Sequence, residues 1–318
     1  MLVPFLTAAI SMGVTYLFGA VGETLIEKSG NLNLGIPGIM SLGALGGVIG
    51  VNLYLALFPN NMIAILLILF AIIFSIIFAA LGGLIYSVFT ITLQANQNVT
   101  GLVLTTFGVG FMKFIGSKLD TTRLTEASKY ISKLFSNYKA LGWFGEIFLS
   151  HGILVYLAFA IAIIVAIVLN KTKVGLFLRS VGESPQTADA QGINVSLYKY
   201  VSTLIGSAIA GLGGLYYVMD RSGGTTFVEA SIEAFGWLAV ALVIFSMWKP
   251  LLCIVGSIAF GGLYILPSFI NVSNIQLKLF EILPYLVTVI VLIVLSIFNN
   301  KNNQPPKSLG VNYYREDR

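Results

Sequence analysis

Long apolar segments alternate with short polar connectors along the whole chain. Nine of these segments approach the roughly 20 residues that a helix needs to cross about 30 Å of hydrocarbon. They lie near residues 3–22, 35–57, 62–93, 99–117, 147–170, 198–219, 232–248, 251–270 and 280–298. The first has no basic stretch before it and no convincing cleavage site, so we expect it to be retained. The pattern predicts an all-α polytopic membrane protein whose residues 1–300 form one transmembrane domain of about nine helices.

Composition points to the same class. Hydrophobic residues make up 57% of the 318 positions and charged residues 10%, whereas a soluble globular domain carries roughly 25% charged residues. So few charges cannot cover a surface that faces water on all sides. The chain is therefore expected to lie in a lipid bilayer.

The distribution of Lys and Arg predicts the orientation, because short loops rich in these residues lie on the cytoplasmic side. The tail at 301–318 carries four of them and is expected to be cytoplasmic. A polar connector at 171–197 should lie on the same side, since four predicted spans separate it from the tail. The N-terminus and the connector at 118–146 are then external.

The external connector at 118–146 departs from the charge rule, because it contains five Lys and Arg residues. Its YISKLF core has apolar side chains near helical spacing at Tyr130, Ile131, Leu134 and Phe135. Such spacing is consistent with an amphipathic helix on the outer surface or with a docking face for an extracellular protein. A solvated loop is the alternative.

The connector at 171–197 is the most informative polar segment of the chain. Ser184 and Pro185 predict a helix start, since the Ser hydroxyl can cap free amides and Pro suits the first helical position. Gly192 predicts the end of that helix. The short helix would display Gln186, Thr187, Asp189 and Gln191 to water. A folded polar connector of this kind indicates a binding site for a protein outside the lipid.

Two blocks of the sequence share the same internal spacing. One follows the first span and the other follows the sixth, and these two spans should run in opposite directions. The matching residues are Ser29, Gly30 and Gly43 in the first block and Ser222, Gly223 and Gly236 in the second. The match is consistent with an inverted-topology repeat, in which a substrate site lies near the midplane. A coincidence of residues common in membrane helices is the alternative.

Uncharged polar residues near predicted span ends form a candidate substrate pathway. Amides are costly in hydrocarbon unless they face protein or water, so they suggest a lumen. The candidate residues are Asn31, Asn33, Asn96, Asn98 and Thr100. A turn at the inner surface explains the second group, at 94–100, equally well.

The titratable residues favour neither an ion-driven carrier nor an enzyme. A carrier would ordinarily hold an acid within a span, but the candidate acids fall in connectors or at span ends. The single Cys253 is expected to be a small buried hydrophobe, and the single His151 an interfacial polar residue with no metal role. The acids are Glu23, Glu27, Asp220, Glu229 and Glu233.

The sequence contains no GxxxxGK[ST] phosphate loop, so any ATP would be bound by a partner. No cofactor is expected in this chain.

The residues around the polar connector carry a resemblance to a known family. The segment VGLFLRSVGESPQTADAQGINV resembles the cytoplasmic coupling loop of permease subunits of ABC importers in the branched-chain amino acid, ribose and nucleoside branch. The block GETLIEKSGNLNLGIPGIMSLGAL and the ending SLGVNYYREDR are similar to that family as well, and most to the shorter of two paired nucleoside permeases. Ser184 and Thr187 depart from it, where Asn and Ala are common. The matching loop residues are Gly175, Leu178, Arg179, Val181, Gly182, Glu183, Pro185, Ala188, Gly192, Ile193, Asn194 and Val195.

The resemblance implies a type II ABC-importer-like permease that moves nucleosides inward across a bacterial plasma membrane. It implies an ATP-binding subunit docked on the helix at 185–191, a second permease, and an extracellular substrate-binding lipoprotein, with no nucleic acid partner. A permease for branched-chain amino acids or sugars is an alternative, and an ion-coupled secondary carrier is a more distant one. The implied coupling residues are Arg179, Gly182, Glu183, Ser184, Pro185, Thr187, Ala188, Asp189, Gly192, Ile193 and Asn194.

Overall fold

The computed structural model describes residues 2–59, 63–119, 122–132, 141–226, 228–270, 274–298 and 304–314, and within these ranges no strand occurs. Each of the nine apolar segments forms a helix. Seven helices are long and apolar enough to cross a membrane, α11 has 17 residues, and α13 contains the apolar stretch Ile282–Ile293. The predicted all-helical membrane fold is confirmed. The nine helices are α1 (Leu2–Glu27), α2 (Ile36–Leu57), α3 (Ala64–Ser87), α4 (Gln97–Gly116), α7 (Ile153–Lys171), α10 (Val195–Tyr216), α11 (Glu229–Phe245), α12 (Pro250–Ile265) and α13 (Asn274–Phe298).

Four shorter helices occupy the two long connectors. The connector at 118–146 contains α5 (Thr122–Ile131) and the start of α6 (Gly142–Phe148), and the connector at 171–197 contains α8 (Lys173–Glu183) and α9 (Pro185–Ala190). Single π-helical turns at Val88–Thr92 and Tyr217–Arg221 extend α3 and α10, and a 3-10 turn at Leu266–Ser268 follows α12.

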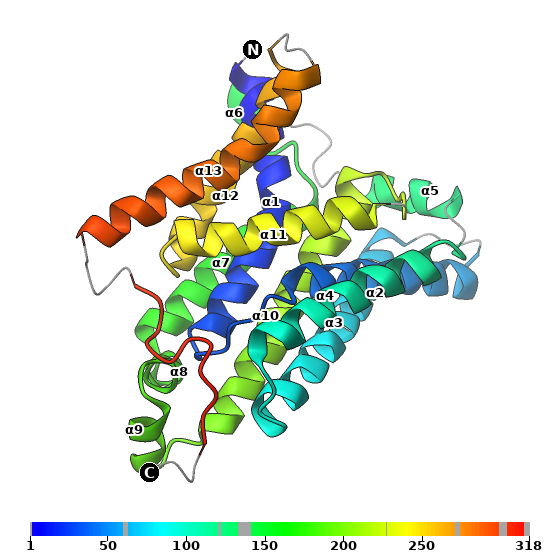
Figure 1. Cartoon of the computed structure of the whole chain (residues 1–318). Coiled ribbons are helices and arrows are strands. Elements are labelled where there is room, and N and C mark those ends of the chain that lie inside the picture. The colour runs from blue at the N-terminus through cyan, green and yellow to red at the C-terminus, as the bar shows by residue number, and fades with distance from the viewer. Residues whose placement is uncertain are drawn as a thin grey trace.

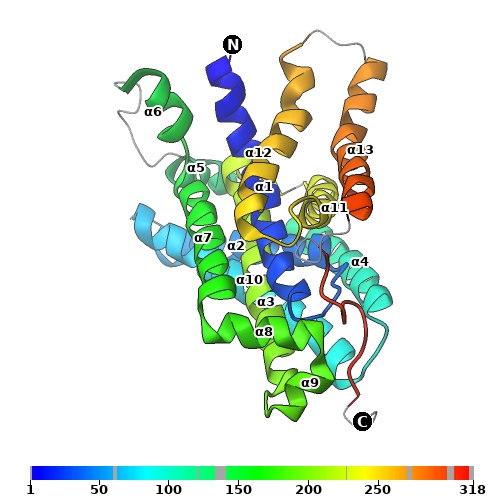
Figure 2. The same cartoon turned by 90° about the vertical axis from the view of Figure 1, so that its left-hand side faces the viewer.

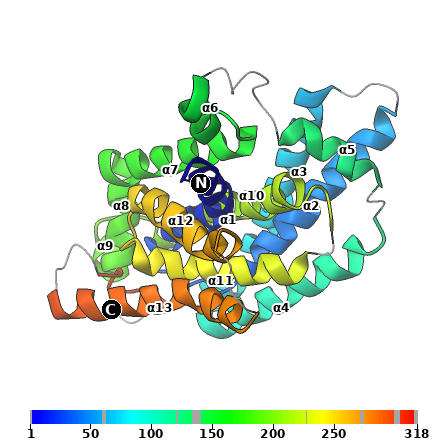
Figure 3. The same ribbon diagram turned by 90° about the horizontal axis from the view of Figure 1, so that it is seen from above.

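Helix α1 lies near the centre of the bundle when it is seen from above (Figure 3), and it packs against α10, α11 and α12. The α1–α10 crossing depends on two glycines. A Cβ atom on Gly22 would lie 2.3 Å from the Gly206 carbonyl oxygen, and one on Gly206 would lie 2.5 Å from the Gly22 carbonyl oxygen. Small residues allow membrane helices to approach this closely. Any side chain here would push the two central helices apart.

The first four and the last four long helices pack in one pattern with exchanged roles (Figure 1). Helix α1 contacts α11 and α12, and α10 contacts α2 and α3; α2 lies against α3 and α4, and α11 lies against α12 and α13. The Ser11 hydroxyl in the first half of α1 lies 2.9 Å from the Tyr216 hydroxyl at the end of α10, and Gly22 near the end of α1 lies against Gly206 in the middle of α10. The two helices therefore run in opposite directions. This packing supports the predicted inverted repeat.

The two connectors lie at opposite ends of the bundle (Figure 2). We define the α6 face as the end formed by α6, the start of α1 and the end of α10 at 217–223. The α9 face is the opposite end, formed by α8, α9, the turns at 28–35 and 93–96, and the segment 304–314. The predicted placement of the two connectors on opposite sides agrees with this arrangement.

Helix α5 includes only the first part of the YISKLF core, for which a surface amphipathic helix, a docking face and a solvated loop were the alternatives. It ends at Ile131, and Leu124, Ala127 and Ile131 are buried against the rest of the protein, next to α2, α3 and the end of α10. Tyr130 is exposed, while Leu134 and Phe135 lie outside the described residues. The described apolar side chains of α5 therefore cover the bundle itself, while the alternatives for the part of the YISKLF core at Leu134 and Phe135 stay predictions.

Candidate functional site

Local hydrogen bonds begin α8, which was not predicted from the sequence, and α9, which was. The Thr172 hydroxyl accepts the Gly175 amide at 3.1 Å and begins α8, and the Ser184 hydroxyl accepts the Thr187 amide at 3.4 Å and begins α9. Pro185 is the first residue of α9, and Gly192 has a φ of +81°, in the left-handed region that favours glycine. The predicted start and end of the short helix are therefore confirmed.

One face of α9 is exposed and the other is packed. Gln186, Thr187 and Gln191 are exposed, as predicted, while Pro185 and Ala188 are buried. Ala188 packs in a small cluster with Val181 and Val195, against which Ile193 and Tyr313 lie. Because its buried side is packed against the protein, α9 can present its exposed side to a partner as a rigid surface.

Asp189 does not point freely into water, which differs from the sequence prediction. Its carboxylate accepts a hydrogen bond of 2.8 Å from the Tyr313 hydroxyl, and the residue is half-buried. The segment that contains Tyr313 is the C-terminal tail, for which sequence reasoning had predicted only a side of the membrane.

Gly182 lies where α8, the α1–α2 turn and the tail meet. A Cβ atom on Gly182 would lie 2.3 Å from the Lys28 carbonyl oxygen. The Gly182 carbonyl accepts the Ser308 amide at 3.0 Å. Gly182 thus joins the connector at 171–197 to the end of the central helix through backbone contacts.

Three further predicted coupling residues lie on α8 and at the start of α10. Arg179 donates to the Gly175 carbonyl at 3.4 Å, and the Asn194 side chain accepts the Leu197 amide at 3.0 Å to begin α10. Glu183 is exposed. Burial lowers the pKa of Lys28, and the negative charge of Glu183 opposes that shift, so the two side chains influence each other across the junction.

The predicted pathway residues fall into two groups on the α9 face. Asn31 and Asn33 are buried: Asn31 donates to the Thr203 hydroxyl at 3.0 Å, and the Asn33 side-chain oxygen accepts the Gly35 amide at 2.9 Å. The Asn33 side-chain nitrogen is buried without a hydrogen-bond partner. The local turn provides a hydrogen bond to the side-chain oxygen of Asn33 but none to its side-chain nitrogen.

The second group lies at the start of α4. Asn96 and Asn98 are exposed, Asn96 accepts the Val99 amide at 3.1 Å, and Thr100 donates to the Asn96 carbonyl at 2.8 Å. Their contacts are those of a helix start. Gln97 joins the two groups, because its side-chain oxygen accepts the Leu32 amide at 2.7 Å.

The end of α1 corrects one sequence prediction. The helix continues to Glu27 and does not end near residue 22, so Glu23 and Glu27 are helical and buried. Glu23 accepts the Asn33 amide at 3.2 Å, and Glu27 accepts the Trp248 indole N–H. Sequence periodicity could not find Trp248 as a partner, because it belongs to a turn 221 residues away.

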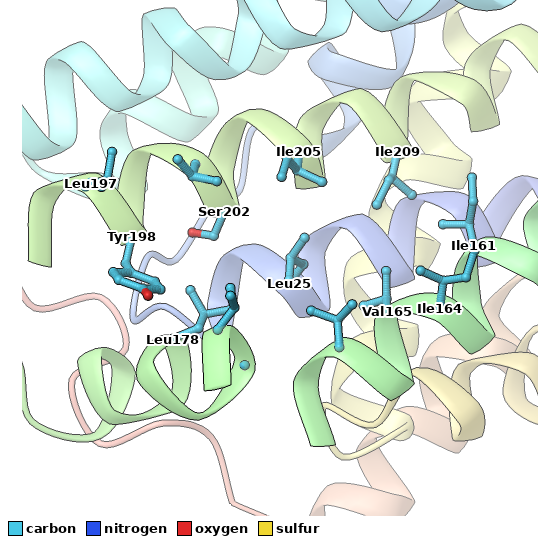
Figure 4. Close-up of a pocket in the computed structure, with 14 residues that line it drawn as sticks. Leu25, Ile161, Ile164, Val165, Leu178, Leu197, Tyr198, Ser202, Ile205 and Ile209 are labelled. Carbon is cyan, nitrogen blue, oxygen red and sulfur yellow. The ribbon is translucent and has the colours of Figure 1, made fainter. Parts of the chain in front are cut away.

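An apolar groove of about 470 Å³ lies between α1, α7, α8 and α10. Figure 4 shows the aliphatic side chains of Leu25, Val165 and Ile205 around it, with the hydroxyls of Tyr198 and Ser202 at one end. Ser202 donates to the Lys199 carbonyl at 3.0 Å. The lining favours hydrocarbon and offers few partners to a polar substrate.

A second cavity, of about 420 Å³, opens on the α6 face and is polar. Its lining includes Ser11, Ser150, His151, Asp220 and Arg221. Burial lowers the pKa of His151, and its Nε2 atom lies 3.0 Å from the Ile147 carbonyl oxygen. The described residues contain no cluster of three His, Cys, Asp or Glu side chains suited to a metal ion, and Cys253 is buried as predicted.

Within the described residues, seven helices are long and apolar enough to cross a membrane, which makes this a multi-pass membrane protein. The model of the family described as branched-chain amino acid transport system, permease component, matches residues 5–292. The chain belongs to this family. It is a transport permease and not an enzyme, and the family resemblance drawn from the sequence is confirmed.

Individual relatives extend the comparison. The nucleoside ABC transporter permease protein NupC of Lactococcus lactis is 32% identical over 94% of this chain and 93% of its own length. The putative glucose ABC transporter permease protein TsgC13 of Haloferax volcanii is 30% identical over 80% of this chain and 74% of its own length. A further nucleoside ABC transporter permease protein of L. lactis, NupB, is 26% identical over 70% of this chain and 62% of its own length. No solved structure matches the chain.

Proposed function

We propose that this chain is the transmembrane permease subunit of an ATP-driven importer of nucleosides in a bacterial plasma membrane. The α9 face would be cytoplasmic, and the exposed side of α9 would dock on a separate ATP-binding subunit. The observation that carries this proposal is the α8–α9 unit, which is capped at both ends, packed on one side, exposed on the other, and joined to the central helix at Gly182.

The α8–α9 unit would transmit the movement of the ATPase. ATP-dependent closure of the partner would displace α9, and the Gly182 contact would carry that displacement to the end of α1. Such a rigid-body transition can switch a pathway between outward and inward access. The ATPase, a second permease and an extracellular substrate-binding lipoprotein are the proposed partners. Two nucleoside permeases with similarity to this chain occur in L. lactis, which favours a heterodimer.

Nucleosides are the proposed substrates for two reasons. Two of the relatives described above are nucleoside permeases. The candidate pathway offers neutral amides and hydroxyls that suit a sugar and a base, at Asn31, Asn33, Asn96, Asn98 and Thr100. A neutral site suits a neutral ligand, because burying an unpaired charge is costly. A sugar is the second candidate substrate, since TsgC13 is a putative glucose permease.

Reconstitution of the importer with its partners tests the assignment. We expect proteoliposomes to take up radiolabelled uridine or adenosine when ATP is present on the α9 side, with competition by guanosine and little by glucose. Asn33→Leu should lower the uptake rate more than it changes which nucleoside competes best. Glucose or leucine uptake without competition by nucleosides would remove the nucleoside assignment and leave the importer assignment in place.

A docking variant tests the coupling role separately. Gln186→Trp places a bulky side chain on the exposed side of α9, and Glu126→Trp places the same side chain on the exposed side of α5. We expect only the first variant to lose co-purification with the ATPase. Equal binding of the ATPase by both variants would refute docking on α9.

A further inference from the structure

The C-terminal segment 304–314 has no helix of its own, yet it contacts three parts of the α9 face that are far apart in sequence. It crosses α8 and α9, the turn between α1 and α2, and the turn between α3 and α4. Figures 1 and 2 both show this segment running beside α8 and α9 toward the C-terminus. We call it the strap.

The first set of contacts fixes the strap at the Gly182 junction. The Ser308 amide donates to the Gly182 carbonyl at 3.0 Å, and the Ser308 hydroxyl donates to the same oxygen at 2.5 Å. Two residues further on, the Gly310 amide donates to the Gly30 carbonyl at 3.2 Å. The strap therefore binds α8 and the α1–α2 turn at the same place.

The second set fixes the strap to the turn that precedes α4. The Asn312 side-chain nitrogen donates to the carbonyls of Gln94 and Ala95, at 2.6 and 3.2 Å. The Asn312 side-chain oxygen accepts the Gln97 side-chain amide at 2.9 Å. Because Gln97 also accepts the Leu32 amide, Asn312 is linked through one side chain to the α1–α2 turn as well.

The third set reaches the helix proposed to dock on the ATPase. The Tyr313 hydroxyl donates to the Asp189 carboxylate at 2.8 Å, and the Tyr313 carbonyl accepts the Gln94 side-chain amide at 3.3 Å. Hydrogen bonds to charged groups are stronger than neutral ones. A polar cavity of about 400 Å³ opens between α9, Gln94 and Tyr313, so a protein docked on α9 would also meet the strap.

We infer that the strap transmits the displacement of α9 to the turns that precede α2 and α4. This inference rests on the proposed function, since it requires an ATPase that moves α9. A displacement of Asp189 acts on Tyr313, and the adjoining Asn312 passes it to the turn at 93–96 and through Gln97 to the turn at 28–35. These two turns hold the candidate pathway residues Asn33 and Asn96. The strap thus connects the docking helix to the inner end of the pathway.

The test compares two conservative variants in the complete importer in proteoliposomes. The double variant Asn312→Ala with Tyr313→Phe removes the side-chain bonds to the α3–α4 turn and to Asp189. The control Tyr314→Phe makes the same chemical change at the next residue, whose side chain is 43% exposed. The measured quantity is the number of uridine molecules imported for each ATP hydrolysed.

We expect the double variant to bind the ATPase and to hydrolyse ATP within about twofold of the parental rate, because α9 keeps its caps and its packing. Uridine imported per ATP should fall about tenfold, because the double variant loses the three side-chain hydrogen bonds of Asn312 and the bond from Tyr313 to Asp189. The control should match the parental protein.

A second readout follows the movement itself. A single cysteine at the exposed Asn98, in a Cys253→Ser background, should show a labelling rate that changes on ATP binding in the parental complex and stays constant in the double variant. An unchanged import ratio or a retained change at residue 98 would overturn the inference, and so would loss of ATPase binding in the double variant. Failure of the parental chain to bind any ATPase would refute the proposed function before the variants are compared.

Discussion

The end of α1 and the end of α10 carry the same types of residue in the same order. Residues 27–30 are Glu, Lys, Ser and Gly, and residues 220–223 are Asp, Arg, Ser and Gly. Both serine hydroxyls donate to a carbonyl of the preceding helix, at 2.7 Å for Ser29 and 2.9 Å for Ser222. Gly30 and Gly223 both have positive φ, at +88° and +64°. The backbone bonds of the two turns differ, because the Ser29 amide donates to the Ile26 carbonyl at the end of an α-helix and the Ser222 amide donates to the Tyr217 carbonyl at the end of a π-helical turn.

The surroundings of the two turns differ. Glu27 accepts a hydrogen bond from the Trp248 indole, and Gly30 is covered by Gly182 and Ser308. In contrast, one carboxylate oxygen of Asp220 is buried without a hydrogen-bond partner, and Arg221 is exposed beside the polar cavity of the α6 face. The similar sequences therefore give each helix end a serine side-chain bond and a glycine with positive φ, while partners from distant segments make one end a fixed junction and leave the other beside an open cavity.

The largest effect is expected from a methyl group at the junction of the α9 face. Gly182→Ala places a Cβ atom 2.3 Å from the Lys28 carbonyl oxygen, and such overpacking costs about 3 kcal/mol. We expect a lower melting temperature in detergent and loss of uptake. Gly110→Ala is the matched control, since a Cβ atom there meets nothing within 4 Å. Equal melting temperatures for the two variants would show that the junction is not tightly packed.

The paired acids provide the next test. Trp248→Phe leaves a buried carboxylate oxygen of Glu27 without its donor, which should destabilise the protein by about 2 kcal/mol. Asp220→Asn removes a charge that lacks such a donor, so we expect no destabilisation. Thermal unfolding of both variants measures the difference. A larger loss of stability for Asp220→Asn than for Trp248→Phe would contradict this comparison and would indicate a rigid α6 face.

A smaller effect is expected at the end of α9. Gly192→Leu introduces a side chain at a φ of +81°, where the conformation costs about 1 kcal/mol although the space around the residue is open. Membrane insertion and melting temperature should change little, while uptake coupled to ATP hydrolysis falls. Uptake at the parental rate would show that coupling does not depend on the backbone conformation at the end of α9.

Cysteine labelling sharpens the comparison without a change in stability. In a Cys253→Ser background, single cysteines at the exposed Thr125 and Gln186 should lie on opposite sides of the membrane. A membrane-impermeant thiol reagent should label the first in intact cells and the second only after permeabilisation. Reaction of both from one side would contradict the assignment of α5 and α9 to opposite faces.

Apolar segment length predicted all nine long helices, because a bilayer imposes one length on every span. Capping chemistry predicted α9, because Ser184, Pro185 and Gly192 act on the backbone within a few residues. Apolar segment length placed the end of α1 five residues too early. Glu23 and Glu27 are unfavourable in lipid and require partners that hydropathy does not show.

The membrane class, the helical segments, the family and the short helix at 185–190 could be predicted from the amino-acid sequence, because these depend on composition and on contacts between near neighbours. In contrast, three contacts became visible only in the folded protein: Gly182 against Lys28, Trp248 donating to Glu27, and the strap joining α9 to two distant turns. These contacts link residues far apart in the chain, and Trp248 lies 221 positions from Glu27. No local propensity encodes such a pairing, since it arises only when the central helices pack and bring their ends to one face.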